Sequence, residues 1–355
     1  MSTAKRPGLQ TAQRKVEHLR INLEEDPRHR EVTTGLERYR FVHNALPELD
    51  GASVDVSTVF LGKPLRAPLL LSCMTGGVEP GGRINHNLAE AAEALGLAMG
   101  VGSQRAAIDN PERGVFYQVR HLAPSVPLLA NLGAVQLNYG YGVKECLRAV
   151  EMVRADALVL HLNPLQEMLQ PEGNVNFSGL LKRIETVCRE LPVPVIVKEV
   201  GWGISEGVAK SLQRAGVWAI DVAGSGGTSW SEVEKHRADT DRRYRVAANF
   251  SAWGIPTAEA IGMARRGAPG TVIIASGGIR TGIDVAKCIA LGADMAGLAS
   301  PVLKAAAVST ENLLEALQAI IDELRTALFC VGAGGLNQLK GTPALQPVVG
   351  VAQRL

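Results

Sequence analysis

This chain of 355 residues has few aromatic side chains, no long apolar run and little excess of either charge. Only 4% of the residues are Phe, Trp or Tyr, which argues against a surface that stacks nucleic-acid bases. The net charge is +2, so no charge imbalance calls for a nucleic-acid partner. No apolar run is long enough to span a bilayer, and we expect no membrane association.

Residues 1–30 are polar and charged, without the apolar core of a signal peptide. Cysteine is also sparse. The cysteines are odd in number and none is spaced as CxxC, so we expect neither a disulfide framework nor a zinc site. Reduced thiols fit a cytoplasmic protein. The five cysteines are Cys73, Cys146, Cys188, Cys288 and Cys330.

Glycine and short apolar runs, by contrast, are abundant, with 38 glycines and 46% hydrophobic residues. From about residue 68, apolar runs alternate with segments of helical periodicity such as 85–95, 180–191 and 282–291. Runs apolar on both faces are typical of buried parallel strands. They span residues 68–73, 97–101, 128–131, 157–162, 195–199, 219–222, 272–276 and 295–298. Such a series predicts an α/β fold, a (β/α)8 TIM barrel, with a doubly wound sheet as the alternative.

The remaining segments suggest three regions: an N-terminal extension over 1–60, the barrel over 61–340 and a C-terminal tail over 341–355. The extension contains a helix-like stretch, Thr11–Leu19, which composition alone makes a solvated charged helix. Residues 223–250, after the sixth strand, form a glycine-rich and then strongly charged insertion. Long loops at that end of a barrel are commonly active-site lids.

Two consecutive strand ends predict a phosphate site. Gly277 and Gly278 follow the strand Ile273–Ala275 and precede a helix, and Ala299-Ser300 leave the next strand. Glycine lets the backbone approach a ligand closely, and the N–H groups of a helix start favour anions. Adjacent turns of this kind after the last two strands form the phosphate site of many TIM barrels.

The earlier strand ends also carry polar groups, and in a TIM barrel the chemistry lies at these carboxyl ends. The densest group is His161, Asn163, Gln166 and Glu167, where Glu167 is either a magnesium ligand or a solvated carboxylate. The polar ends span residues 72–77, 102–105, 131–133, 161–167, 198–199 and 224–228.

Lys198 follows an apolar strand directly and is therefore expected at the barrel mouth. Lysine is seldom buried without a partner. It could form a Schiff base, stabilise a ligand that gains negative charge, or pair with Glu199 or another carboxylate. The residue alone does not decide among these roles.

Taken together, these strand ends resemble the type 2, flavin-dependent isopentenyl-diphosphate isomerases along nearly the whole chain. The His161–Glu167 run HLNPLQE is specific to that family, whereas the GGIRTGxD turn is shared with several FMN barrels. Further matching segments span 14–18, 74–77, 102–105, 197–199, 226–230, 253–257 and 330–332.

The resemblance implies an FMN-binding barrel in which Lys198 stabilises negative charge on the reduced flavin. The flavin phosphate would lie on Gly277, Gly278, Ile279, Arg280, Ala299 and Ser300. The isoalloxazine edge would meet Cys73, Met74, Thr75, Ser103, Asn131, Lys198 and Thr228. Two positions depart from the family pattern: Ala223, where serine is common, and Ser300, where a smaller residue is usual.

The substrate that the resemblance implies is isopentenyl diphosphate, which is interconverted with dimethylallyl diphosphate by a 1,3-proton shift. Reduced FMN would assist this shift, and NADPH or another reductant would reduce the FMN. Glu167 would hold Mg²⁺ on the diphosphate, and Gln166, a poor base, would position or relay a proton beside the isoprene carbons. The N-terminal arm would close over the site, and a homo-tetramer or octamer is implied. The substrate-binding set is Arg14, Lys15, Arg105, His161, Asn163 and Gln166.

Three other functions compete with this interpretation. An FMN-dependent 2-hydroxy-acid dehydrogenase shares the late phosphate turns but should show a histidine–arginine pair after the later strands, and the Gly224–Thr228 region has no histidine. An IMP-dehydrogenase-type barrel needs a cysteine in a glycine-serine loop, yet Gly102-Ser103 is followed by Gln104. A non-catalytic flavin binder would not need the His161–Glu167 cluster.

Overall fold

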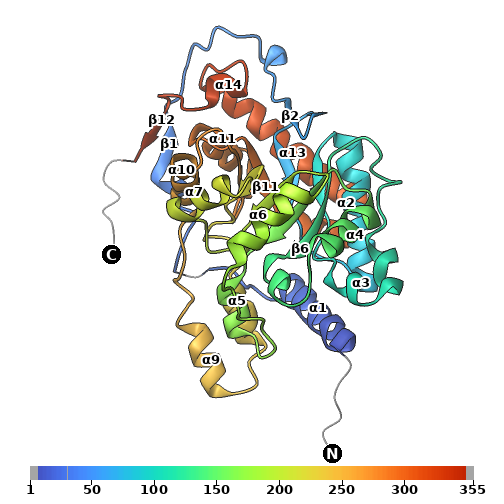
Figure 1. Ribbon diagram of the computed structural model, residues 1–355. Helices are drawn as coiled ribbons and strands as arrows, with labels where there is room; N and C mark the ends of the chain where they lie inside the picture. Colours follow the sequence, from blue (N-terminus) through green and yellow to red (C-terminus); the bar gives the residue numbers. More distant parts are fainter. Residues whose placement is uncertain (1–6, 30, 349–355) are drawn as a thin grey trace, which may run out of the picture.

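The computed structural model describes residues 7–29 and 31–348, and a closed barrel of eight parallel strands forms its centre (Figure 1). The strands follow chain order, and β11 pairs with β4 to close the circle. The predicted (β/α)8 barrel is confirmed, since every strand overlaps a predicted apolar run. The strands are β4 (Leu69–Leu71), β5 (Ala98–Gly100), β6 (Leu128–Gly133), β7 (Ala157–His161), β8 (Val195–Lys198), β9 (Ala219–Asp221), β10 (Val272–Ala275) and β11 (Met295–Leu298).

Amphipathic helices surround the barrel and bury one face against it, as Leu180, Ile184 and Val187 of α6 do. Helix α11 begins with a capping box, in which Thr281 accepts from the Asp284 N–H and Asp284 from the Thr281 N–H. The surrounding helices are α2 (Glu79–Leu95), α3 (Arg105–Asp109), α4 (Val143–Val153), α6 (Leu180–Glu190), α7 (Glu206–Arg214), α10 (Thr257–Gly267), α11 (Gly282–Ala290), α12 (Ser300–Val308), α13 (Thr310–Cys330) and α14 (Leu336–Leu339). Short 3-10 turns are η1 (Leu36–Arg38), η2 (Gly51–Ser53), η3 (Pro111–Tyr117) and η4 (Ala134–Asn138).

Alternation along the strands gives the barrel interior an apolar layer and, above it, a polar one. The apolar layer includes Leu70, Ala98, Leu129, Val159, Ile196, Ala219, Ile274 and Met295. In each strand, the residue two positions after the apolar-layer residue points to the same side of the sheet. This set, which we call the mouth ring, consists of Ser72, Gly100, Asn131, His161, Lys198, Asp221, Ser276 and Gly297.

The segment before the barrel is more structured than its composition indicates. Helix α1 spans Pro7–Glu24, longer than the predicted 11–19, and the strands β2 (Thr58–Phe60) and β3 (Lys63–Leu65) form a hairpin. Strand β1 (Tyr39–Phe41) pairs antiparallel with β12 (Leu345–Pro347). The expected boundary at residue 60 therefore falls inside the hairpin, and the tail from residue 341 contributes a strand.

The insertion after β9, the sixth barrel strand, contains two helices where a loop was expected. Helices α8 (Trp230–His236) and α9 (Asp241–Ala248) pack against each other and against α5 (Pro164–Leu169). In Figure 1, α1, α5 and α9 lie at the same end of the barrel. These three helices, which come from distant parts of the chain, cover the carboxyl ends of the strands.

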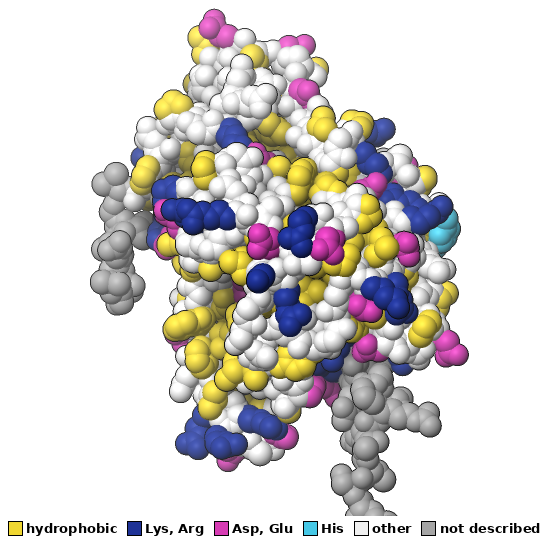
Figure 2. All heavy atoms as spheres, in the orientation of Figure 1, with side chains coloured by type: hydrophobic (Ala, Val, Ile, Leu, Met, Phe, Trp, Pro, Cys, Tyr) yellow, Lys and Arg dark blue, Asp and Glu magenta, His cyan; other side chains and the backbone are white. Residues whose placement is uncertain are grey.

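The surface carries mixed charge and the described helices are not membrane-like. On the face drawn in Figure 2, Lys and Arg lie interspersed with Asp and Glu. Among the helices within 7–29 and 31–348, none combines the length and the apolar character needed to cross a membrane. All five cysteines are free thiols in the structure.

Candidate active site

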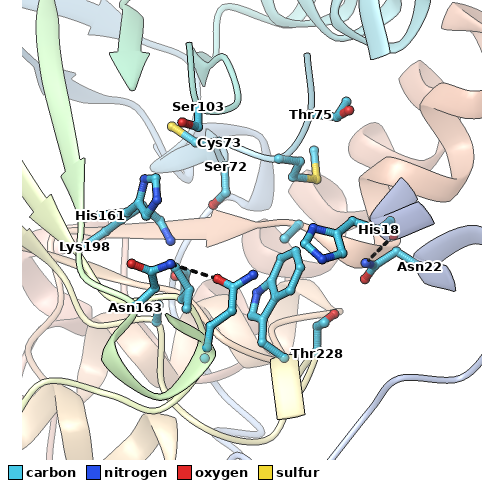
Figure 3. A pocket seen from close by; sticks show the side chains of 18 of the residues that line it. His18, Asn22, Ser72, Cys73, Thr75, Ser103, His161, Asn163, Lys198 and Thr228 are labelled. Carbon is cyan, nitrogen blue, oxygen red and sulfur yellow. Dashed lines mark hydrogen bonds between the residues drawn. The ribbon is translucent and has the colours of Figure 1, made fainter. Parts of the chain in front are cut away.

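A cavity of about 270 Å³ opens at the carboxyl ends of the barrel strands. Its wall contains every site residue predicted from the sequence, including Gln166, Glu167 and both glycine turns. Figure 3 shows side chains from several strand ends around an open centre, with His18 and Asn22 of α1 on one side. Strand-end residues outside the predicted binding sets also line it, namely Ser72, Gly76, Gly133, Ala223 and Gly227. The sequence analysis gave no site role to the remaining lining residues: His18, Leu19, Asn22, Gln136, Gln170, Val200, Gly201, Trp230, Ser276, Gly297, Pro301 and Leu303.

The predicted phosphate turns are glycine-dependent. Gly277 and Gly278 have φ of 101° and 79°, in the left-handed region that favours glycine. A Cβ on Gly277 would lie 2.0 Å from the Gly224 carbonyl oxygen, and one on Gly227 would lie 2.5 Å from the Gly278 nitrogen. The turns after β9 and β10 are thus packed backbone against backbone, which leaves room for a ligand on their cavity side.

His161 and Asn131 of the mouth ring are hydrogen-bonded to each other at the cavity floor. His161 Nδ1 lies 2.9 Å from Asn131 Oδ1, so Nδ1 carries the proton and Nε2 is left as an acceptor. Burial, and then the positive charges of Lys198, Lys15 and Arg14, lower the pKa of His161 to about 3. His161 is therefore neutral at physiological pH in the absence of an anion.

Lys198 and Cys73 complete this floor, and neither is set up as a nucleophile. Lys198 Nζ donates to the Glu199 carbonyl oxygen at 2.5 Å. The Glu199 carboxylate does not pair with it, because Oε2 accepts the N–H groups of Val200, Gly201 and Trp202. Burial raises the pKa of the Cys73 thiol to about 11, so it stays protonated.

The His161–Glu167 run forms a buried amide–carboxylate network at the start of α5. Asn163 Nδ2 donates to Gln166 Oε1 at 3.0 Å and to Glu167 Oε1 at 2.9 Å. Glu167 Oε2 accepts from the Gln170 side chain and the Asn174 backbone. Asn163 Oδ1 is buried without a partner among the described residues. The network thus offers two kinds of oxygen, carboxylate and amide, which suit a hard divalent cation.

Helix α1 is held against the cavity by a partly buried lysine. Lys15 Nζ donates to the carbonyl oxygens of Gly76 (2.9 Å) and Ser103 (2.7 Å) and to the Tyr117 hydroxyl (2.6 Å). Burial, followed by the charges of Arg14 and Arg113, lowers the pKa of Lys15 to about 7. All three ammonium protons therefore go to protein oxygens.

A histidine–carboxylate contact and several ion pairs attach the other side of α1 to α8 and to the loop after α5. His18 Nε2 lies 3.0 Å from Glu234, and Arg237 contacts Glu17 (2.9 Å) and Glu234 (2.6 Å). For Arg14, by contrast, the only ion pair among residues 7–29 and 31–348 is a 3.8 Å contact with Glu172. Arg14 and Arg105 influence each other electrostatically, since burial and then Arg105 lower the pKa of Arg14. Two neighbouring arginines of this kind favour an anionic ligand.

The residues present fit a phosphorylated flavin in this cavity. The glycine turns leave backbone exposed to it, and the mouth ring supplies a cation and polar groups at the floor. Ser72 Oγ lines the cavity and, within the part of the chain that the structure describes, is buried without a hydrogen-bond partner. Such an orphaned hydroxyl indicates a site built for a polar ligand.

Fold and cavity together define an FMN-binding α/β barrel. The profile of the FMN-dependent dehydrogenase family matches residues 154–345. Isopentenyl-diphosphate delta-isomerase from Nostoc sp. strain PCC 7120 is 55% identical over 96% of this chain and 97% of its own length. The proteins of that name from Synechocystis sp. strain PCC 6803 and Rickettsia prowazekii are 53% and 49% identical, each over more than nine-tenths of both chains. The chain belongs to the isopentenyl-diphosphate delta-isomerase family, in its FMN-dependent type 2 form, and is an enzyme.

Solved structures of other FMN enzymes share the fold at much lower identity. A mandelate oxidase variant has a TM-score of 0.65 at 18% identity and covers 98% of this chain and 100% of its own. A lactate oxidase from Pediococcus acidilactici has a TM-score of 0.63 at 16% identity, covering 93% and 86%. These likenesses show the fold alone. They give no support to the hypothesis of a 2-hydroxy-acid dehydrogenase, because these oxidases are only distant structural neighbours.

Proposed function

We propose that this chain interconverts isopentenyl diphosphate and dimethylallyl diphosphate, using FMN that NADPH or another reductant keeps reduced, together with Mg²⁺. One observation carries the proposal: the flavin turns, the arginine pair and the His161–Glu167 network line a single cavity. A flavin and a diphosphate ester bound there would be neighbours. Reduced FMN supplies an electron-rich, proton-exchanging surface to an isomerisation without net redox change.

The diphosphate end of the substrate is bound by charge. Arg14 and Arg105 present guanidinium groups that bind phosphate oxygens in pairs of hydrogen bonds. Lys15 adds positive charge but has its three protons on protein oxygens, so it contributes chiefly field and the position of α1. His161 Nε2 meets the anion only after taking up a proton, because His161 is neutral in the free protein.

Glu167 and Asn163 are the proposed oxygen ligands on the protein side of Mg²⁺. Within residues 7–29 and 31–348, no group of three or more His, Cys, Asp or Glu side chains could hold a metal ion by itself. A cation at Glu167 would therefore share its coordination with substrate phosphates and water, as Mg²⁺ commonly does.

The isoprenoid end of the substrate lies toward Gln166 in this proposal. Gln166 is held by the Asn163 amide and lines the cavity, and an amide is a poor base, so it positions or relays a proton and does not abstract one alone. Helix α1 keeps water away from the reacting carbons. Water would otherwise trap a carbocation-like centre. Lys198 stabilises negative charge on the reduced cofactor.

The direct test incubates purified protein anaerobically with FMN, Mg²⁺ and isopentenyl diphosphate, with and without NADPH, and follows dimethylallyl diphosphate. Product formed only with reduced flavin, and without stoichiometric NADPH consumption, supports the proposal. A yellow protein that forms no product would contradict it and favour a dehydrogenase or a flavin carrier.

The role of Gln166 has its own test. Gln166→Asn shortens the side chain by one methylene, and we expect at least tenfold slower turnover of the flavin-reduced enzyme with FMN content unchanged. Gln318→Asn, the same chemical change on the outer helix α13, serves as the matched control. Unchanged turnover in Gln166→Asn would remove the residue from the mechanism.

The proposal also includes a cytoplasmic location, a small-molecule diphosphate as the partner, and a homo-tetramer or octamer as the assembly. Light scattering of the purified protein in solution measures the mass of the assembly, and a monomer at micromolar concentration would contradict that part.

A further inference from the structure

The mouth ring contains a carboxylate, Asp221, that has no place in the chemistry described above. Strand β9 pairs with β8 so that Asp221 lies in register with Lys198, and it pairs with β10 so that Asp221 lies in register with Ile274, two residues before Ser276. Because register partners in a parallel sheet point to the same face, Lys198, Asp221 and Ser276 are consecutive members of the ring. Asp221 does not line the cavity, whereas Lys198 and Ser276 do.

Asp221 is buried but supplied with donors. Its side chain is 2% exposed, and Oδ1 accepts the Ser276 hydroxyl at 2.5 Å and the Ala223 N–H at 3.3 Å. Burial raises its pKa, while the Lys198 charge and then the Ser276 hydroxyl oppose that rise. A buried carboxylate is costly without a positive neighbour, and Lys198 is the cation of the ring.

No member of the mouth ring other than Asp221 carries a negative charge that could offset the positive charge of Lys198. His161 is neutral, Ser72, Asn131 and Ser276 are uncharged, and the Glu199 carboxylate is bound by backbone N–H groups. The Lys198 ammonium uses one donor on the Glu199 carbonyl and faces the cavity with the rest of its charge. Asp221 is therefore the negative charge that balances the group facing the flavin.

We propose that Asp221 is a positioning residue that lies beside Lys198 in the ring and partly neutralises its charge, and thereby sets the reduction potential of the bound FMN. An ionised Asp221 weakens the stabilisation that Lys198 gives to the anionic reduced flavin, which keeps the potential low. This rests on FMN occupying the cavity and not on the identity of the isoprenoid substrate.

The test measures the midpoint potential of the FMN-loaded protein by spectroelectrochemical titration, without isoprenoid substrate. In Asp221→Asn the amide keeps the shape and removes the charge, so reduction becomes easier. We expect the reduction equilibrium constant to rise about tenfold, equivalent to about 30 mV for a two-electron couple. Asp322→Asn, which removes an exposed carboxylate on α13, should leave the potential unchanged.

A double-variant cycle separates action through Lys198 from a direct effect of Asp221 on the flavin. If Asp221 acts through Lys198, Asp221→Asn in a Lys198→Met background should change the potential much less than it does in the wild-type background. An unchanged potential in Asp221→Asn alone, or a full shift in the Lys198→Met background, would overturn the proposal.

If Asp221→Asn fails to hold FMN, Ser276→Ala gives the same information. Loss of its hydroxyl donor makes the Asp221 carboxylate less stable as an anion, and we expect a smaller rise of the potential; no rise would overturn the proposal. Because all readings are taken without substrate, a failure of the isomerase assay leaves this result interpretable.

Discussion

Tyr117→Phe should loosen helix α1 without disturbing the barrel. The Tyr117 side chain is fully buried, and its hydroxyl donates to the Ser103 carbonyl at 2.6 Å while accepting from Lys15 Nζ at 2.6 Å. Phenylalanine keeps the ring that packs against Gly76 and removes only the oxygen, which lies beside Gly77. The ammonium of Lys15 then has one N–H without an acceptor in a buried place.

The expected magnitude follows from that lost contact. A hydrogen bond to a charged group contributes about 2 kcal/mol. The contacts of His18 and Arg237 still hold the other side of α1, so the helix remains docked but opens more often. A loss of about 2 kcal/mol in the free energy of opening corresponds to about 30-fold faster opening-limited amide exchange.

Hydrogen–deuterium exchange followed by mass spectrometry measures this directly, with peptides covering residues 14–24 compared between wild type and variant. Peptides from α13 serve as an internal reference and should exchange at the same rate in both. Tyr244→Phe, which removes a half-exposed hydroxyl on α9, is the matched control. Exchange of the α1 peptides within threefold of wild type would refute the reasoning that Lys15 and Tyr117 hold the helix.

Two further outcomes are expected. Gly277→Ala should weaken FMN binding at least tenfold in a fluorescence titration, because its Cβ would meet the Gly224 carbonyl; Gly270→Ala, equally left-handed but in open space, should bind normally, and equal affinities would contradict the clash. Since the pKa of His161 is about 3 in the free protein and a bound diphosphate raises it, substrate binding should take up a proton. Affinity should therefore increase as pH falls toward 6, and calorimetry in two buffers of different ionisation enthalpy should show a proton uptake that is smaller in His161→Gln; the uptake left in that variant belongs to Lys15, whose pKa of about 7 is raised by the same anion.

The barrel and its cavity could be predicted because both leave local marks in the sequence. Buried parallel strands appear as short apolar runs, and their carboxyl ends meet at one rim, so polar residues after successive runs, from Thr75 to Ser300, belong together. For the same reason the whole predicted set of site residues lines one cavity.

Contacts between distant segments could not be predicted in this way. Lys15 is held by oxygens 61 to 102 residues away, two of them backbone carbonyls that carry no residue signature. The spacing of Arg14, His18 and Asn22 does place them on one helical face, yet periodicity does not reveal what that face meets. Charged residues in 223–250 concealed two helices, because α9 owes its position to packing with α8. Asp221 did leave a signal, a carboxylate within an apolar strand, whose meaning came only from its neighbour Lys198.

The pairing of β1 with β12 gives the protein a definite order of assembly on the ribosome. Tyr39 finds its partner only when Pro347 has been synthesised, whereas the barrel circle closes once β11 pairs with β4. A nascent chain can thus complete its parallel barrel before β1, the strand that follows α1, has its partner β12. The segment that links helix α1 to the barrel therefore gains its β1–β12 pairing only after all eight barrel strands have been synthesised.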